Sequence, residues 1–515
     1  MAILQRNVKQ AEVRMRTFLI AFALAFFTGI ALTWVIRNLA IRAGLYDKPE
    51  GRKIHSQPIP RLGGIAVAIA FFVPIVGLAL WNNDISAAFF AERGLLISLT
   101  GGGALILALG IHDDLKGAGA LIKLIGQITA AMVVFHAGVQ IDVISIPFVG
   151  YMKLGLWSFP FTIFWIVLIT NALNLIDGLD GLAGGVATLA GLTLFVMSLV
   201  QGNVVGALVM VSMVGATLGF LRFNWNPASI FLGDTGSLFL GFLLATVSAH
   251  GSQKSFALFS IVAAFVALAL PIFDLSMAVI RRFLTGKKIF GADQYHIHHL
   301  LLRKGLSQRQ AAITLLGGAT ILGGFALVLI YSSDRISALS IVALAALTVV
   351  VIHFLGYADI IRAGRRSMLF GKLEEAARER ALRVDEIRAQ MLEAADEEDL
   401  WRYLVPAGKA LDLETFRFNV LSTDGPGVEK KSLEWKRSRA GEGNSVHIQT
   451  MVKAEYTVAA GKVIFGTLQL EWLQENSIFD PHQHALGRIL ADALAQAICA
   501  LRGLTPVEHR KDLRA

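Results

Sequence analysis

The chain is poor in cysteine and in charge, and both shortages exclude classes of protein. Cys499 is the only cysteine among 515 residues, so the sequence offers neither an intramolecular disulfide nor a metal site built from several thiolates. Charged residues make up only 17% of the chain and hydrophobic residues 55%, more apolar sequence than a soluble globular protein needs. The net charge of +9 is not a nucleic-acid signature, because the cations are distributed among these apolar segments.

Apolar runs recur between residues 17 and 360, and most are close to the length of about 20 residues that spans a bilayer, although the run near 237–250 is shorter. The first run is too long for a signal-peptide core, and no cleavage site follows it. We therefore predict an all-α polytopic membrane protein with about eleven transmembrane helices. The runs lie near residues 18–36, 62–80, 94–111, 119–138, 156–173, 181–200, 203–221, 237–250, 256–280, 311–330 and 336–357.

The basic residues between the runs predict the orientation of the chain in the inner (plasma) membrane. They concentrate in stretches 37–61 and 281–309, and the positive-inside rule places these stretches in the cytoplasm. An odd number of spans then leaves residues 360–515 in the cytoplasm as well. The basic residues within stretch 6–16 oppose this orientation, because they would lie outside.

Asp113, Asp114 and Lys116 close one apolar run. Two adjacent carboxylates raise the pKa of one of them, which suits proton transfer or metal binding. The alternative is a helix end capped by solvated acids.

Another run ends in Asn171, Asn174, Asp177 and Asp180, each three residues from the next. On a helix this spacing places the side chains along one face. Two asparagines and two aspartates at the end of an apolar run are difficult to explain by packing alone.

Asp234 lies in the turn Gly233-Asp-Thr-Gly-Ser237. An open turn with one carboxylate suits a hard divalent ion such as Mg²⁺, with Mn²⁺ as an alternative, although a plain loop has the same composition.

Three histidines, His296, His298 and His299, lie in the basic stretch 281–309. A histidine cluster binds zinc or donates to phosphate oxygens, and the surrounding cations favour the anion. A solvated loop without a role is the alternative.

The loop 47–64 carries Arg52 and His55 among prolines and glycines. Both side chains could bind phosphate, or the loop could serve only as a positive-inside anchor.

Composition changes at residue 360. Residues 361–399 have the spacing of an amphipathic helical linker, which is a candidate for homodimer formation. Residues 400–505 alternate like strands and end in a helix, which predicts a soluble α+β domain. Its order, a Gly-Thr-Leu strand, Phe479-Asp-Pro481 and an Ala/Leu-rich helix, resembles the second half of a GAF domain and suggests a small ligand or a soluble partner. Residues 1–17 and 506–515 form an N-terminal segment and a basic tail.

The polar motifs of residues 18–360 together resemble the polyprenyl-phosphate N-acetylhexosamine-1-phosphate transferases. They follow one another in the order that this family has, and the His-Ile-His-His form is more similar to the WecA/TagO type than to MraY. The matching residues are Asp47, Arg52, His55, Pro58, Pro60, Gly63, Gly64, Asp113, Asp114, Asn171, Asn174-Leu-Ile-Asp177-Gly-Leu-Asp180-Gly-Leu, Phe231-Leu-Gly-Asp234-Thr-Gly-Ser and His296-Ile-His298-His299.

The resemblance implies transfer of N-acetylhexosamine 1-phosphate from a UDP-sugar to undecaprenyl phosphate, with Mg²⁺ as cofactor and UMP as the second product. It implies metal ligands at Asp234 and Asn174. Catalytic roles would fall to Asp113, Asp114, Asp177 and Asp180, in a direct attack by the lipid phosphate or through a covalent aspartyl intermediate. Substrate binding would fall to Arg52, His55, Lys116, Asn171, His296, His298 and His299. The first expectation for the sugar is N-acetylglucosamine, and the product would start a cell-surface polysaccharide.

Two other classes remain open from the residues alone. A transporter would account for many spans with acids at their borders, but the acids lie on one side and no inverted repeat is evident. A membrane sensor would use the GAF-like segment, but it leaves the polar motifs without a purpose.

Overall fold

The computed structural model divides the chain into two units, residues 1–362 and 363–515. In the first unit the structure describes residues 2–47, 58–81, 83–146, 150–254, 260–286, 295–331, 334–357 and 362. In the second it describes residues 379, 382–410, 413, 415–421, 429–436, 450–460, 463–474 and 481–502. The two units have separate hydrophobic cores.

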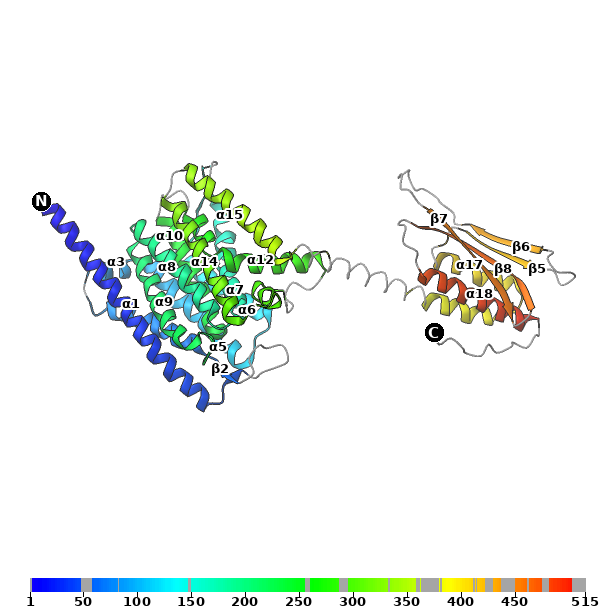
Figure 1. Cartoon of the computed structure of the whole chain (residues 1–515), viewed down its shortest axis with the longest axis horizontal. Coiled ribbons are helices and arrows are strands. Elements are labelled where there is room, and N and C mark those ends of the chain that lie inside the picture. Colours follow the sequence, from blue (N-terminus) through cyan, green and yellow to red (C-terminus); the bar gives the residue numbers. More distant parts are fainter. Residues whose placement is uncertain are drawn as a thin grey trace. The chain divides into compact units, whose positions relative to one another are not determined.

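The first unit is a bundle of helices (Figure 1). Its helices are α1 (Ala2–Arg42), α2 (Gly63–Leu78), α3 (Asp84–Ala91), α4 (Arg93–Ile97), η1 (Ser98–Gly102), α5 (Gly103–Lys116), α6 (Ala120–His136), η2 (Gly155–Trp157), α7 (Ser158–Ile176), α8 (Leu182–Val200), α9 (Val204–Asn224), α10 (Gly233–Lys254), α11 (Ser260–Ala267), α12 (Ala269–Leu284), α13 (Ile297–Arg303), α14 (Gln308–Tyr331) and α15 (Asp334–Leu355). Two short antiparallel hairpins pair β1 (Tyr46–Asp47) with β2 (Ile59–Pro60) and β3 (Val143–Ile146) with β4 (Gly150–Lys153).

A polytopic membrane architecture is confirmed, but the predicted count of eleven spans is not. Seven helices in the described part of the chain are long and apolar enough to cross a bilayer, or eight if α11 and α12, bent by 77°, form one span. A helix lies over each predicted run, yet α2 and α6 have only 16 and 17 residues and α10 is not among the seven. The apolar runs therefore predicted where helices lie, but not how many of these helices are long and apolar enough to cross the bilayer.

Helix α10 is the centre of the bundle and packs against α2, α5, α7 and α8. Its residues 238–245 are buried, because neighbouring helices surround this part of α10. Two glycines allow its first turn to approach its neighbours. A Cβ on Gly64 of α2 would lie 2.0 Å from the Gly236 nitrogen, and a Cβ on Gly110 of α5 would lie 2.4 Å from Thr235 Cα. The ends of α2, α5 and α10 consequently meet at one place.

The second unit is an α+β arrangement with a four-stranded antiparallel sheet (Figure 1). The strands are β5 (Thr415–Leu421), β6 (Glu429–Lys436), β7 (Thr450–Ala460) and β8 (Val463–Gln474), in the order β6-β5-β8-β7, accompanied by helices α17 (Glu397–Ala410) and α18 (Pro481–Leu501). Helix α18 packs on β7 and β8. Val384, Ile387 and Met391, from the segment predicted as a linker, are buried in this core. The likeness to a GAF domain stays a prediction.

Candidate active site

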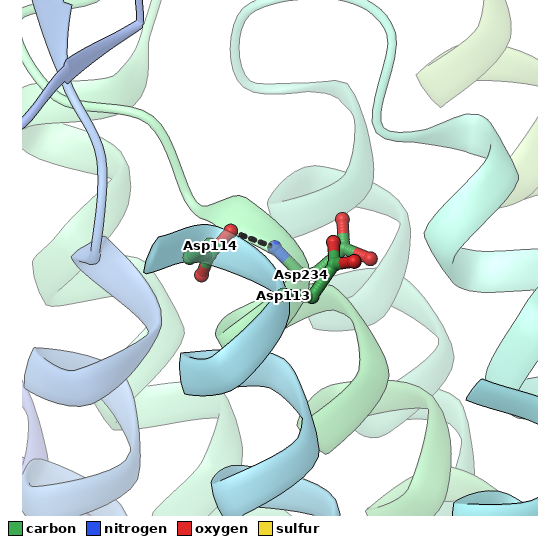
Figure 2. A group of neighbouring side chains, drawn as sticks. All are labelled: Asp113, Asp114 and Asp234. Carbon is green, nitrogen blue, oxygen red and sulfur yellow. Dashed lines mark hydrogen bonds between the residues drawn. The ribbon is translucent and has the colours of Figure 1, made fainter. Parts of the chain in front are cut away.

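Three aspartates converge where α5 ends and α10 begins. Asp113 and Asp114 lie in the last turn of α5, and Asp234 lies in the first turn of α10. Each can offer one carboxylate oxygen within 4.8 Å of the others, and each side chain is half-buried. Figure 2 shows the carboxylates of Asp113 and Asp234 next to each other, with Asp114 on the other side of the helix end. The structure therefore brings together two motifs that lie about 120 residues apart in the sequence.

Asp114 closes the N-terminus of α10. Its carboxylate accepts from the backbone nitrogen of Asp234 at 2.9 Å (Figure 2). It also accepts from the Thr235 nitrogen (3.0 Å) and from Thr235 Oγ1 (2.6 Å). The first N–H groups of a helix have no partner within the helix, so a carboxylate from another helix stabilises this end. Gly233 adopts a φ of +74°, and a Cβ there would lie 2.6 Å from Asp114 Oδ2. Asp114 therefore fixes the direction of the turn that carries Asp234.

Lys123 of α6 bridges the other two carboxylates. Its Nζ lies 2.8 Å from Asp113 Oδ2 and 2.5 Å from Asp234 Oδ2. Asp113 Oδ1 also accepts from the Ala118 nitrogen at 2.6 Å. Sequence reasoning missed Lys123 and selected Lys116, which lies exposed at the end of α5. The available signal was a single lysine inside the apolar run 119–138, because a cation there is costly unless it has a partner.

Asn174 and Asp177 extend the cluster from the end of α7. Asn174 Nδ2 donates to Ser237 Oγ (2.9 Å), and that hydroxyl donates to the Gly233 carbonyl (3.0 Å), so α7 is tied to the first turn of α10. Asp177 follows the last residue of α7 and is half-buried. This burial, together with the negative charges of Asp234, Asp114 and Asp180, raises the pKa of Asp177 to about 8. At neutral pH the Asp177 carboxyl therefore retains its proton.

Two of the predicted residues make contacts that hold helices and loops together. Asp180 Oδ2 accepts from Asn226 Nδ2 (2.9 Å) and from the Ala228 nitrogen (3.0 Å), which fixes the loop before α10. The Asn171 amide pairs in both directions with the buried Gln127 amide of α6. These contacts position the site, and direct roles in binding or catalysis stay predictions for both residues.

His298 of α13 packs against the turn between Asp177 and Asp180. A Cβ on Gly178 would lie 2.4 Å from His298 Nε2, so a glycine is needed for this approach. Burial, and secondarily the charge of His299, lowers the pKa of His298 to about 3, which keeps its ring neutral at physiological pH. His298 Nδ1 has no hydrogen-bond partner among the described residues. Of the three predicted phosphate binders, His298 can therefore contribute only a neutral imidazole.

His296 is held by Asp274, a residue of α12 that sequence reasoning did not select. Its Nδ1 lies 3.0 Å from Asp274 Oδ2, and Asp274 Oδ1 accepts from the Ile297 nitrogen at 2.8 Å. Arg52 and His55 lie outside the described residues. Arg61, which follows β2, acts on the carboxylate of Asp114 through its positive charge.

The donor atoms of the cluster fit a hard divalent cation. Asp113 and Asp234 offer carboxylate oxygens, and the amide of Asn174 is bonded to Ser237 in the first turns of α10, whereas cysteine is absent from this part of the sequence. Mg²⁺ and Mn²⁺ prefer such oxygen ligands. In the structure the ammonium of Lys123 lies between the carboxylates of Asp113 and Asp234.

Several known proteins similar to this chain are named as transferases. Residues 96–252 match the family model described as Glycosyl transferase family 4. The chain is 38% identical over 303 residues to a probable undecaprenyl-phosphate N-acetylglucosaminyl 1-phosphate transferase of Bacillus subtilis, covering 59% of this chain and 82% of that protein. It is 37% identical to a decaprenyl-phosphate N-acetylglucosaminephosphotransferase of Mycolicibacterium smegmatis (57% and 77% covered). It is 32% identical to a phospho-N-acetylmuramoyl-pentapeptide-transferase of Lactiplantibacillus plantarum (56% and 89% covered).

Proposed function

The chain belongs to the polyprenyl-phosphate N-acetylhexosamine-1-phosphate transferases of glycosyl transferase family 4, and we propose that it transfers N-acetylglucosamine 1-phosphate from UDP-N-acetylglucosamine to undecaprenyl phosphate. The observation that carries this proposal is the convergence of Asp113, Asp114 and Asp234 where α5 ends and α10 begins. A lipid acceptor reaches such a site from the bilayer and a nucleotide sugar reaches it from water. The product would start a cell-surface polysaccharide.

In the proposed reaction, an oxygen of the lipid phosphate attacks the phosphorus attached to the sugar. The bond from this phosphorus to the bridging oxygen breaks, and UMP leaves with that oxygen. Both reactants carry negative charge, so the site must supply positive charge to bring them together. Lys123 supplies one cation, and Arg52, His55 and the histidines of α13 are proposed as further partners of the phosphates.

Asp113, Asp234 and Asn174 would hold Mg²⁺, or Mn²⁺ in its place. The ion would offset the charge of the diphosphate when bound. Asp113 faces Lys123 and is the proposed group for orienting or deprotonating the lipid phosphate. A phosphate monoester is already largely ionised at neutral pH, so positioning would carry most of the rate.

The remaining acids have supporting roles in this proposal. The contacts of Asp114 favour a positioning role, since its oxygens are engaged with α10. Asp177, protonated at neutral pH, is a hydrogen-bond donor for the nucleotide or for a water near the metal. Asp180, Asn171 and Lys116 stay candidates for nucleotide contacts from the rim.

We place the site on the cytoplasmic side of the inner membrane, where UDP-sugars are made. The concentration of basic residues in stretches 37–61 and 281–309 supports this orientation. The second unit would then be cytoplasmic and would bind a small ligand, a soluble partner or a second copy of the chain.

The test is UMP release by purified protein, with and without undecaprenyl phosphate and with and without Mg²⁺. We expect release only when both are present, and fastest release with UDP-N-acetylglucosamine in a comparison with UDP-N-acetylgalactosamine and UDP-glucose. Release without the lipid would indicate a hydrolase. An absence of release under all conditions would favour the transporter or sensor interpretations.

A further inference from the structure

Asp274 is a buried carboxylate in an otherwise apolar segment. It lies in α12, half of the bent helix pair that is apolar enough to cross a bilayer, and it is only 1% exposed. A carboxylate in such a place is costly, so it is retained where it has a defined partner. Neither the family motifs nor the carboxylate cluster accounts for it.

Both oxygens of Asp274 are used to hold the start of α13. Oδ2 lies 3.0 Å from His296 Nδ1, and Oδ1 accepts from the Ile297 nitrogen at 2.8 Å. A carboxylate accepts hydrogen bonds only, so the hydrogen of this contact belongs to Nδ1 of the ring. The tautomer and the direction of His296 are thereby set, and Nε2 is the ring atom left for another partner.

A second contact on the same helix face fixes the residue before His296. Arg281 follows Asp274 by seven residues, two turns along the buried face of α12. Its guanidinium lies 5.3 Å from the ring centre of Tyr295, and the guanidinium of Arg303 lies 4.5 Å from the same ring. Two consecutive residues that follow α12 in the sequence, Tyr295 and His296, therefore both contact side chains of α12.

His296 is connected to the carboxylate cluster through contacts of His298. The rings of His296 and His298 stack with centroids 5.8 Å apart and planes 4° apart. His298 in turn lies against Gly178, next to Asp177. A change in the position of His296 would consequently affect His298 and the turn at Gly178, which borders the candidate active site.

We propose that Asp274 is a positioning residue, which holds His296 so that its Nε2 donates a hydrogen bond to a phosphate oxygen of a substrate. With Nδ1–H bonded to the carboxylate, a proton on Nε2 gives an imidazolium whose charge is balanced by Asp274 and attracted to phosphate. This inference rests on the proposed function, since the UDP-sugar and the lipid acceptor both carry phosphate. The kinetics of the two substrates distinguish which phosphate is bound.

Asp274→Asn tests this arrangement with little change in size. The amide oxygen can still accept from the Ile297 nitrogen, but the amide group cannot balance an imidazolium. We expect the KM of one substrate to rise about tenfold, the change that the loss of one charge-assisted hydrogen bond produces. The KM of the other substrate and the melting temperature should stay near the wild-type values. Asp142→Asn is the matched control, because Asp142 also accepts a hydrogen bond (from Ser158 Oγ, 2.9 Å) but lies before α7 and away from its Asp177 end.

A double-mutant cycle with His296→Gln separates positioning from general support of the fold. If Asp274 acts through His296, Asp274→Asn should add nothing to the effect of His296→Gln. Multiplied effects, an unchanged KM for both substrates, or a lower melting temperature that accounts for the loss would each overturn the inference. If the wild-type protein releases UMP and Asp274→Asn changes the KM of neither substrate, the inference about Asp274 is refuted and the proposed function is not. Absence of release from the wild-type protein refutes the proposed function, and with it the assigned phosphate.

Discussion

The charged side chains of the candidate active site lie near helix ends and bond to other helices, whereas the ion pairs described in the second unit lie on its surface. Lys123 joins Asp113 of α5 to Asp234 of α10, and its side chain is only 23% exposed. In the second unit Arg417 pairs with Glu434 at 2.7 Å, with side chains 45% and 33% exposed. Exposed pairs contribute little to stability, while half-buried groups in a membrane protein are costly without partners. The contrast assigns the chemistry to the first unit.

The largest effect is expected for Asp234→Asn. The change removes a carboxylate that faces both Asp113 and Lys123, and with it the preferred ligand for a divalent ion. We expect UMP release to fall by about a hundredfold or more, because even outer-shell partners of metal ligands cost about 10–100-fold when mutated. Glu12→Gln, an exposed site at the far end of α1, is the control. Near-normal turnover of Asp234→Asn at ordinary Mg²⁺ concentrations would refute the metal assignment.

Lys123→Met should have the next largest effect. It keeps the length of the side chain but leaves two carboxylates facing each other without a cation. We expect activity to fall by roughly ten- to a hundredfold, the range for the loss of hydrogen bonds to charged groups. Lys153→Met is the matched control, since Lys153 lies exposed in β4. Equal activities of the two variants would contradict the role of Lys123.

Asp114→Ala tests the capping of α10. The variant should lose about 1–2 kcal/mol of stability, as for the loss of other helix caps. It should also lose activity, because the turn that carries Asp234 is no longer fixed. Thermal unfolding in detergent, followed together with UMP release, checks both effects. A variant with full stability and reduced activity would instead indicate that Asp114 contacts substrate directly.

The pKa of Asp177 predicts a pH-dependent effect on stability. Because the folded value of about 8 lies above the unfolded value near 3.8, the folded state binds more protons between these values. This contribution to stability is complete below pH 3.8 and is lost as the pH rises through 8. Asp177→Asn cannot lose a proton, so its melting temperature relative to wild type should rise between pH 5 and pH 9. The comparison requires chelator, and a constant difference across this range would contradict the protonated state.

Removal of the second unit should have the smallest effect on transfer. All five motifs precede residue 360, and the two units have separate cores. A protein truncated after Arg366 should therefore keep transferase activity of the same order as the full chain. If it inserts normally yet is inactive with saturating substrates, the second unit belongs to the catalytic unit and the contrast between the two units is wrong.

The sequence predicted the acids of the site better than it predicted their partners. Asp113, Asp114 and Asp234 stood out because carboxylates at the ends of apolar runs are rare, and they do meet in the structure. Lys123 and Asp274 lie inside runs that were assigned to the bilayer, so their partners became evident only from the packing of α6 on α5 and of α13 on α12.

Spacing also has limits as a guide to side-chain roles. A three-residue interval predicted Asn174, Asp177 and Asp180 on one helix face. However, α7 ends at Ile176, so Asp177 and Asp180 do not belong to this helix. Asp180 consequently holds the loop at Asn226 in place of extending the cluster. The position of a helix end depends on tertiary contacts that a single spacing rule does not contain.

The central claim is that a sugar 1-phosphate, and not the sugar alone, moves to the lipid. The most direct measurement uses UDP-N-acetylglucosamine with a radioactive label on the phosphorus attached to the sugar, together with undecaprenyl phosphate and Mg²⁺. We predict that the label appears in the lipid product and that the released nucleotide is unlabelled UMP. Label retained in a nucleotide diphosphate, with the sugar on the lipid, would contradict the assigned reaction.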